Sequence, residues 1–209
     1  MTARPKIVAV AGNIGAGKSS LVGWLEQQLG MVPFYEPHAE NPYLADFYQD
    51  MLRWGLHSQL FFLIHRFRIH KDIEERARHE GRHIVQDRTI YEDAEIFAAQ
   101  LHRSGALADR DWAMYCDLYG TLRKELRPPD LMIYLRCSVR AIRRRITRRG
   151  RPSELAIPTV YLQGLNRLYE EWMDGYDLSP KVVWDSERAD YLTHIVDRLE
   201  FRKMIEPFL

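Results

Sequence analysis

Eight residues near the amino terminus have the types and spacing of a phosphate-binding loop. Residues 12–19 read GNIGAGKS and fit the pattern G-x-x-x-x-G-K-[ST]. Glycines let the backbone fold closely around phosphate oxygens, and the positive end of the following helix dipole points at the same anion. Lys18 adds a positive charge, and the hydroxyl of Ser19 can bind the Mg²⁺ that accompanies a nucleoside triphosphate. The loop predicts binding of a nucleoside triphosphate with Mg²⁺ and leaves the phosphate acceptor open.

Three charged residues follow short apolar runs, at positions where an α/β fold gathers its functional groups. Glu36 could accept the proton of an attacking hydroxyl or could be a solvated loop residue. Asp87 could hold Mg²⁺ or could cap the next helix. Arg88 could contact the acceptor oxygen and the transferred phosphoryl group, or it could pair with a surface carboxylate. Position alone does not separate these alternatives.

A strongly basic segment lies in the second half of the chain. Eight of the sixteen residues from 136 to 151 are arginines, although the whole chain carries a formal net charge of +1. On a helix, Arg145 and Arg149 share one face, and Arg140 and Arg144 share another. One face could close over a triphosphate as a lid and stabilise the charge that develops in phosphoryl transfer. The alternatives are a solvated helix and nucleic-acid binding, and the second is disfavoured because no aromatic residues interleave with the arginines.

The elements that must position these residues alternate between strands and helices. Apolar runs predict five strands, at 6–11, 31–35, 83–86, 131–135 and 181–184. Helical spacing predicts a helix after the phosphate loop, two helices within 43–77 broken near Gly55, and further helices at 91–101, 111–126, 139–149, 159–173 and 191–205. This order predicts an α/β fold with a five-stranded parallel sheet flanked by helices.

Composition limits the class of protein. A chain of 209 residues has the length of one domain with lid elements. Hydrophobic residues make up 46% and charged residues 28%, so the chain can bury a core and is neither disordered nor fibrous. Its balanced charge gives no general attraction to nucleic acid or to a membrane surface. Two cysteines build no secreted disulfide framework, and no apolar run approaches a membrane span, so a cytoplasmic location is expected.

Several motifs in order along the chain resemble those of the deoxyribonucleoside kinases, the family of deoxycytidine, deoxyguanosine and deoxyadenosine kinases, in its compact bacterial form. The resemblance covers nearly the whole chain. It lies in GNIGAGKSS at 12–20, Glu36-Pro37, the stretch 41–48, Trp54 with Gln59 and Arg66, DRTIYED at 87–93, and the run 145–151 with Glu154. It implies a P-loop kinase with an arginine-rich lid at residues 145–154, ATP and Mg²⁺ as cofactors, a deoxynucleoside substrate and a homodimer.

The resemblance also implies a role for each matching residue. The catalytic residues would be Glu36 as general base, Arg88 at the 5′-hydroxyl, and Lys18. The triphosphate would bind to Gly12, Asn13, Ile14, Gly15, Ala16, Gly17, Lys18, Ser19 and Ser20 and to the lid residues Arg145, Arg149 and Arg151, and Mg²⁺ would bind to Ser19 and Asp87. The nucleoside would bind to Glu36, Arg88, Tyr48, Trp54, Gln59, Arg66, Asp93, Phe97 and Glu154. Core packing is an equally good interpretation of Trp54 and Phe97.

Within that substrate set, Gln59, Arg66 and Asp93 would read the edge of the base. Gln59 and Arg66 are two helical turns apart and project from one face, and an amide with an Arg and Asp pair supplies donors and acceptors. Tyr48 with Glu154 would hold the sugar 3′-hydroxyl.

In the resembling enzymes the Arg and Asp pair accompanies purines and cytosine, so thymidine is disfavoured, and the bacterial form favours deoxyadenosine or deoxyguanosine. The expected activity is transfer of the ATP γ-phosphate to the 5′-hydroxyl of such a deoxynucleoside. A nucleoside monophosphate kinase and a non-enzymatic ATP-binding protein associated with nucleic acid are the alternatives.

Overall fold

A five-stranded parallel sheet forms the centre of the protein. The computed structural model describes residues 4–35, 40–188 and 193–209. The strands are β1 (Ile7–Ala11), β2 (Val32–Phe34), β3 (Ile84–Asp87), β4 (Leu131–Arg136) and β5 (Lys181–Asp185), and their order across the sheet is β2-β3-β1-β4-β5. All neighbouring strands pair in parallel. The predicted fold class and the five predicted strands are therefore confirmed.

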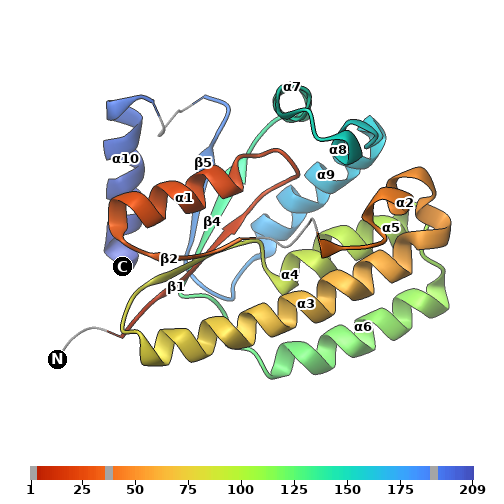
Figure 1. The fold of residues 1–209 in the computed structure, drawn as a ribbon, viewed down its shortest axis with the longest axis horizontal. Helices are drawn as coiled ribbons and strands as arrows, with labels where there is room; N and C mark the ends of the chain where they lie inside the picture. The colour runs from red at the N-terminus through yellow and green to blue at the C-terminus, as the bar shows by residue number, and fades with distance from the viewer. Residues whose placement is uncertain (1–3, 36–39, 189–192) are drawn as a thin grey trace.

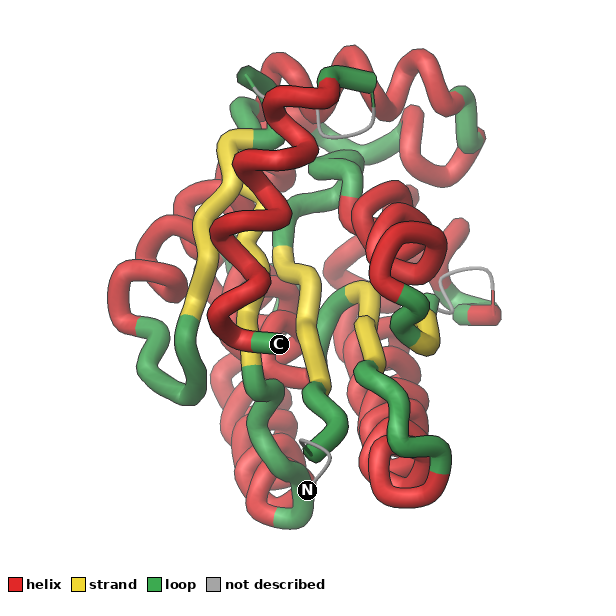
Figure 2. The backbone as a smooth tube through the Cα atoms, turned by 90° about the vertical axis from the view of Figure 1, so that its left-hand side faces the viewer, coloured by secondary structure: helices red, strands yellow, loops and turns green. Residues whose placement is uncertain are grey.

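Two helices cover one face of the sheet. They are α1 (Lys18–Leu29) and α10 (Ile195–Ile205), which lie together in front of the strands in Figure 2. The ring of Phe201 lies 5.6 Å from that of Trp24 and 5.1 Å from that of Trp184, so one aromatic residue joins α1, α10 and β5. The prediction for the last helix began at residue 191, which lies outside the described residues.

The remaining long helices pack on the other face (Figure 1 and Figure 2). They are α3 (Met51–His79), α6 (Asp109–Lys124) and α9 (Thr159–Gly175). Between the two layers, β1 is fully buried and β4 is buried as far as Leu135. Such continuous apolar runs are typical of central parallel strands with both faces covered.

The predicted break near Gly55 is wrong. The chain breaks at Asp50 instead, between α2 (Leu44–Gln49) and α3. Asp50 has a non-helical backbone, and its side chain caps α3 by accepting a hydrogen bond from the Arg53 N–H at 3.0 Å. Gly55 lies within α3, where a Cβ would come 3.4 Å from the Ala106 carbonyl oxygen. This glycine therefore lies inside a helix and marks no helix end.

The predicted helix at 91–101 is present in three parts. A short α4 (Ile90–Glu92) leads into a π-helical stretch, Asp93–Ala98, and then into α5 (Ala99–Arg103). π-Helical turns are rare and are often found at functional sites. Here the wider turn contains Asp93 and Phe97, both of which the sequence analysis assigned to the substrate.

The register of the sheet sets the place of the functional residues. Val10 of β1 is the partner of Asp87 in β3, so the phosphate loop and the residue after β3 leave the sheet side by side. Above these strand ends lie α7 (Val139–Arg149) and α8 (Pro152–Leu155), drawn in green-blue at the top of Figure 1. No helix in the described part of the chain combines the length and apolar character needed to cross a membrane.

Candidate functional site

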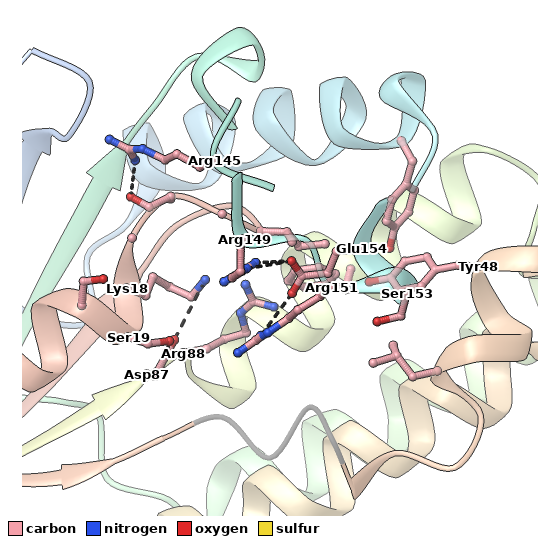
Figure 3. A pocket seen from close by; sticks show the side chains of 18 of the residues that line it. Lys18, Ser19, Tyr48, Asp87, Arg88, Arg145, Arg149, Arg151, Ser153 and Glu154 are labelled. Atoms are coloured by element: carbon pink, nitrogen blue, oxygen red, sulfur yellow. Dashed lines mark hydrogen bonds and ion pairs between the residues drawn. The ribbon is translucent and has the colours of Figure 1, made fainter. Parts of the chain in front are cut away.

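A cavity of about 840 Å³ lies at the carboxyl ends of the strands. Figure 3 shows Lys18, Ser19, Asp87 and Arg88 at one end, and Tyr48 and Ser153 at the other. The predicted site residues that line it are Ile14, Gly15, Ala16, Gly17, Lys18, Ser19, Ser20, Tyr48, Gln59, Asp87, Arg88, Asp93, Phe97, Arg145, Arg149, Arg151 and Glu154. The structure thus brings together residues from six separate segments of the sequence. Glu36 lies outside the described residues.

The backbone of Gly15 and a hydrogen bond from Asn13 to α9 determine the shape of the phosphate loop. Gly15 has a φ of 79°, and a Cβ there would lie 3.2 Å from the Ile146 side chain of α7. Asn13 does not line the cavity. Its side-chain Nδ2 donates to the Leu162 carbonyl of α9 at 3.1 Å, and its side-chain Oδ1 accepts from the Ile14 N–H at 2.8 Å. Asn13 therefore anchors the loop to α9 and leaves the loop backbone facing the cavity.

Lys18, Ser19 and Asp87 meet below the loop. The Lys18 Nζ donates to the Asn13 carbonyl at 3.2 Å and lies 4.0 Å from Asp87 Oδ1. The Ser19 hydroxyl donates to Asp87 Oδ2 at 2.6 Å. Asp87 Oδ1 is buried and has no hydrogen-bond partner among the described residues. A hydroxyl beside a carboxylate oxygen with spare capacity is a donor set that fits Mg²⁺. The alternative role of Asp87 as a helix cap is wrong, because Thr89 caps α4.

Arg88 enters the cavity from a strained backbone. Its φ is 70°, in the left-handed region that non-glycine residues rarely adopt. The guanidinium lies 4.3 Å above the ring of Phe97, and its Nη2 donates to the Gly12 carbonyl at 3.2 Å. With 6% of its surface exposed, Arg88 is not the surface ion-pair partner that the sequence left open. It presents a buried positive charge beside the phosphate loop.

A buried ion pair lies next to the end of β3, where Arg66 Nη1 donates to the Asp87 carbonyl at 3.4 Å. Arg66 Nε donates to Asp93 Oδ2 at 2.7 Å, and both side chains are 3% exposed. Asp93 lines the cavity whereas Arg66 lies behind it. Gln59 also lines the cavity, and its buried side-chain oxygen has no partner among the described residues. These polar groups, next to the Phe97 ring, can receive a planar molecule with hydrogen-bonding edges.

The lid arginines are held by different partners. Arg145 donates to the Ala16 carbonyl of the phosphate loop at 2.7 Å and also binds the backbone carbonyl of Ser186. Arg149 and Arg151 both donate to the carboxylate of Glu154, which is 8% exposed (Figure 3). Arg140 and Arg144 lie near Glu187, with side chains that are 83% and 68% exposed. Arg145 and Arg149 face the cavity as expected, but Arg144 and Arg148 also line it, so the cavity is not confined to one face of the helix.

The structure does not bring Trp54 to the cavity. Its ring stacks on Tyr43 at 5.7 Å and lies 5.4 Å from His57, near the start of α3. Phe47 of α2 lines the cavity instead and is 2% exposed. The helix break at Asp50 explains this difference, because it separates the two aromatic side chains onto different helices.

Tyr161 is a cavity residue that the sequence analysis missed. It lies on α9, is 4% exposed, and its hydroxyl has no hydrogen-bond partner among the described residues. Burial raises the pKa of its phenol well above the usual value. Its spacing on α9 is that of a core residue, so no local sequence signal identifies it. An unpaired buried hydroxyl at a cavity wall is suited to bind a polar ligand atom.

Comparison with known proteins agrees with this geometry. A family model described as deoxynucleoside kinase matches residues 8–209. A deoxyadenosine/deoxycytidine kinase of Bacillus subtilis is 36% identical over 201 residues, which span 92% of this chain and 91% of that protein. A deoxyguanosine kinase of Lactobacillus acidophilus is 35% identical over 202 residues, spanning 92% and 86%. The solved structure of deoxyadenosine kinase from M. mycoides with bound dATP has a TM-score of 0.81 and 32% identity, and the match covers 95% of this chain and 98% of that chain.

The Arg66–Asp93 pair leads to a stability prediction. Replacing Asp93 by Leu removes the carboxylate that balances the buried Arg66 guanidinium and should lower the free energy of unfolding by about 3–5 kcal/mol. Adding Arg66→Met should recover part of this loss, because the buried positive charge is then removed as well. Urea unfolding of both single variants and of the double variant measures the coupling.

The exposed pair Arg202 and Glu206 is a matched control, since its atoms are also 2.7 Å apart. Removing Glu206 should change the free energy of unfolding little, because solvent screens the pair. Strictly additive losses in the Arg66 and Asp93 variants would contradict the proposed coupling.

Proposed function

Because the chain belongs to the deoxynucleoside kinase family, we propose that it transfers the γ-phosphate of ATP to the 5′-hydroxyl of a purine deoxynucleoside, with deoxycytidine as a further acceptor. One observation carries the proposal. A single cavity is lined by a phosphate loop and by buried polar side chains with the ring of Phe97, and Arg88 contacts both the Gly12 carbonyl and that ring. This arrangement supports binding of two substrates end to end, with the phosphate donor at the loop and the nucleoside beyond Arg88.

The chemistry follows from the charges at the loop. The nucleoside 5′-oxygen attacks the γ-phosphorus, the bond to the β-phosphate oxygen breaks, and ADP leaves. Glu36 takes the proton of the attacking hydroxyl. Lys18 and Arg88 stabilise the negative charge that spreads over the transferred group. Ser19 and Asp87 would hold Mg²⁺, which neutralises charge on the β- and γ-phosphates when it is bound.

Residues 145–154 act as the lid over these phosphates. Arg149 and Arg151 both donate to the carboxylate of Glu154, and a triphosphate would compete with that carboxylate for the two guanidinium groups. Arg145 already contacts the loop through the Ala16 carbonyl, which supports its role at the donor. Glu154, the last residue of the lid, and Tyr48 hold the sugar 3′-hydroxyl.

The base end of the cavity favours nucleosides with an exocyclic amine. The Gln59 oxygen has spare capacity to accept a hydrogen bond from an exocyclic amine. Adenine and cytosine present such an amine where thymine and guanine present an oxygen, and guanine carries its amine at another ring position, whereas thymine has none. Thymidine is therefore disfavoured. The relatives described above are deoxyadenosine, deoxyguanosine and deoxyadenosine/deoxycytidine kinases, which supports the same preference.

A phosphorylation assay with each of the four deoxynucleosides, Mg²⁺ and ATP tests the proposal. Deoxyadenosine or deoxyguanosine should be phosphorylated fastest and thymidine slowest. Lys18→Met should lower kcat by about 10²-fold or more, because it removes a charge at the transferred phosphate. Lys71→Met, an exposed lysine of α3, should retain wild-type activity.

Three outcomes of this assay would contradict the proposal. No turnover of any deoxynucleoside would exclude the activity. Equal use of deoxyAMP and deoxyadenosine would identify a nucleoside monophosphate kinase. Thermal stabilisation by DNA or RNA, with none by nucleosides, would indicate the nucleic-acid-associated alternative.

Glu36→Gln tests the general base. The amide retains the size of the side chain but cannot take the proton, so kcat should fall by about 10²–10⁴-fold while the affinity for ATP changes little. Steady-state kinetics with ATP titrated at saturating deoxynucleoside measure both quantities. Turnover close to that of the wild type would remove Glu36 from this role.

The proposal includes a homodimer formed by α3 and α6, which lie side by side at one edge of the molecule (Figure 1). Ile64 and Met114 are exposed there by 41% and 49%, which supports a covered face. Sedimentation velocity should give the mass of two chains, and Ile64→Arg should shift it toward one. Leu199→Arg, an exposed apolar position on α10, is the control and should remain dimeric.

A further inference from the structure

Glu92, the last residue of α4, carries a fully buried carboxylate that joins three parts of the fold. Its Oε1 accepts hydrogen bonds from the Tyr169 hydroxyl of α9 at 2.7 Å and from the N–H of Gly12, the first residue of the phosphate loop, at 3.3 Å. Its Oε2 accepts a hydrogen bond from the Thr89 N–H at 2.8 Å. A helix cap needs only the contact with Thr89, so the contacts of Oε1 require a further explanation.

Arg88 lies between the Glu92 carboxylate and the backbone of Gly12, which Glu92 also binds. The Arg88 Nε lies 3.8 Å from Glu92 Oε1, and its Nη2 donates to the carbonyl of Gly12, the residue whose N–H binds the same carboxylate. Thr89 follows Arg88 directly. Its hydroxyl accepts a hydrogen bond from the Glu92 N–H, and the Glu92 carboxylate accepts one from the Thr89 N–H, so Glu92 fixes Thr89 in place. Among the described residues, Arg88 is the one non-glycine residue with positive φ. A strained backbone of this kind persists where the surroundings determine it, and Glu92 fixes the residue next to it.

The carboxylate occupies this position against an unfavourable desolvation. Burial raises the pKa of Glu92, and the charges of Arg88 and Lys18 together with the hydrogen bonds from Tyr169 and Thr89 oppose that increase. Its negative charge lies next to the cations that a triphosphate would need. On electrostatic grounds alone, Glu92 weakens the site for an anion. Its contribution must therefore come from the positions in which it holds Arg88 and the start of the phosphate loop.

We propose that Glu92 is a positioning residue, which holds Arg88 and the start of the phosphate loop in a single arrangement for phosphoryl transfer. This inference rests on the proposed kinase activity. Glu92 does not line the cavity and therefore acts through Arg88 and Gly12 rather than on the substrate. A displacement of about 1 Å in such a group is enough to lower the rate about 10²-fold, whereas substrate binding by the rest of the cavity is retained.

Steady-state kinetics of Glu92→Gln test the inference. The amide nitrogen cannot accept the hydrogen bonds that one carboxylate oxygen accepts, so Arg88 or the loop should lose its fixed place. We expect kcat to fall at least about tenfold, with KM for ATP unchanged or lower because a negative charge has been removed. Tyr169→Phe removes one donor to Glu92 and should lower kcat by a smaller factor, about two- to fivefold.

Asp130→Asn is the matched control for a merely structural role. The Asp130 Oδ2 accepts from the N–H of Ile7 at 2.8 Å, at the opposite end of β1 from the loop, and Asp130 lies outside the cavity. This variant should lose thermal stability and retain kcat. A folded Glu92→Gln protein with the kcat of the control would overturn the inference. If Glu92→Gln does not fold, an unchanged kcat in Tyr169→Phe overturns it instead. A wild-type protein without activity would contradict the proposed function itself.

Discussion

The turn between β3 and α4 is the constraint on which the site depends. The parallel register of β1 and β3 brings this turn next to the phosphate loop, and the Arg88 N–H extends the strand pairing by one hydrogen bond, to the Val10 carbonyl at 3.0 Å. Immediately after that bond, the backbone enters the left-handed region and a helix begins. Within a few residues the chain thus presents a carboxylate at Asp87 and a guanidinium at Arg88 to the same cavity.

Cations dominate this cavity, and carboxylates or carbonyls of the chain hold them. Lys18 lies near Asp87, Arg88 near Glu92, and the arginines at the end of α7 bind Glu154. Buried charges need such partners, because an unpaired charge away from water is strongly unfavourable. A triphosphate would offer stronger acceptors to the same groups. On binding, its phosphate oxygens would replace the protein carboxylates and carbonyls as partners of these cations. Because the cations are already in place, little reorganisation is needed at the moment of reaction.

The sequence predicted the features that local patterns determine. Buried apolar runs identified β1 and β4, and the motif at 12–19 identified the loop and the helix after it. The break before α3 was misplaced because a glycine can lie inside a helix, as Gly55 does, as well as at a helix end. The Oε1 contacts of Glu92 and the place of Tyr161 depend on residues far apart in the sequence, such as Tyr169 and Glu92, which are 77 positions apart. Such contacts leave no local periodicity, so only the fold revealed them.

The most direct measurement is the affinity of a bisubstrate molecule in which adenosine and deoxyadenosine are joined through their 5′-oxygens by a polyphosphate chain. If one cavity holds donor and acceptor end to end, calorimetry should find this molecule bound far more tightly than ATP or deoxyadenosine alone, because the second contact is intramolecular. Both ATP and deoxyadenosine should displace it. Displacement by only one of them, or an affinity no better than that of ATP, would show that the two substrates do not share this cavity.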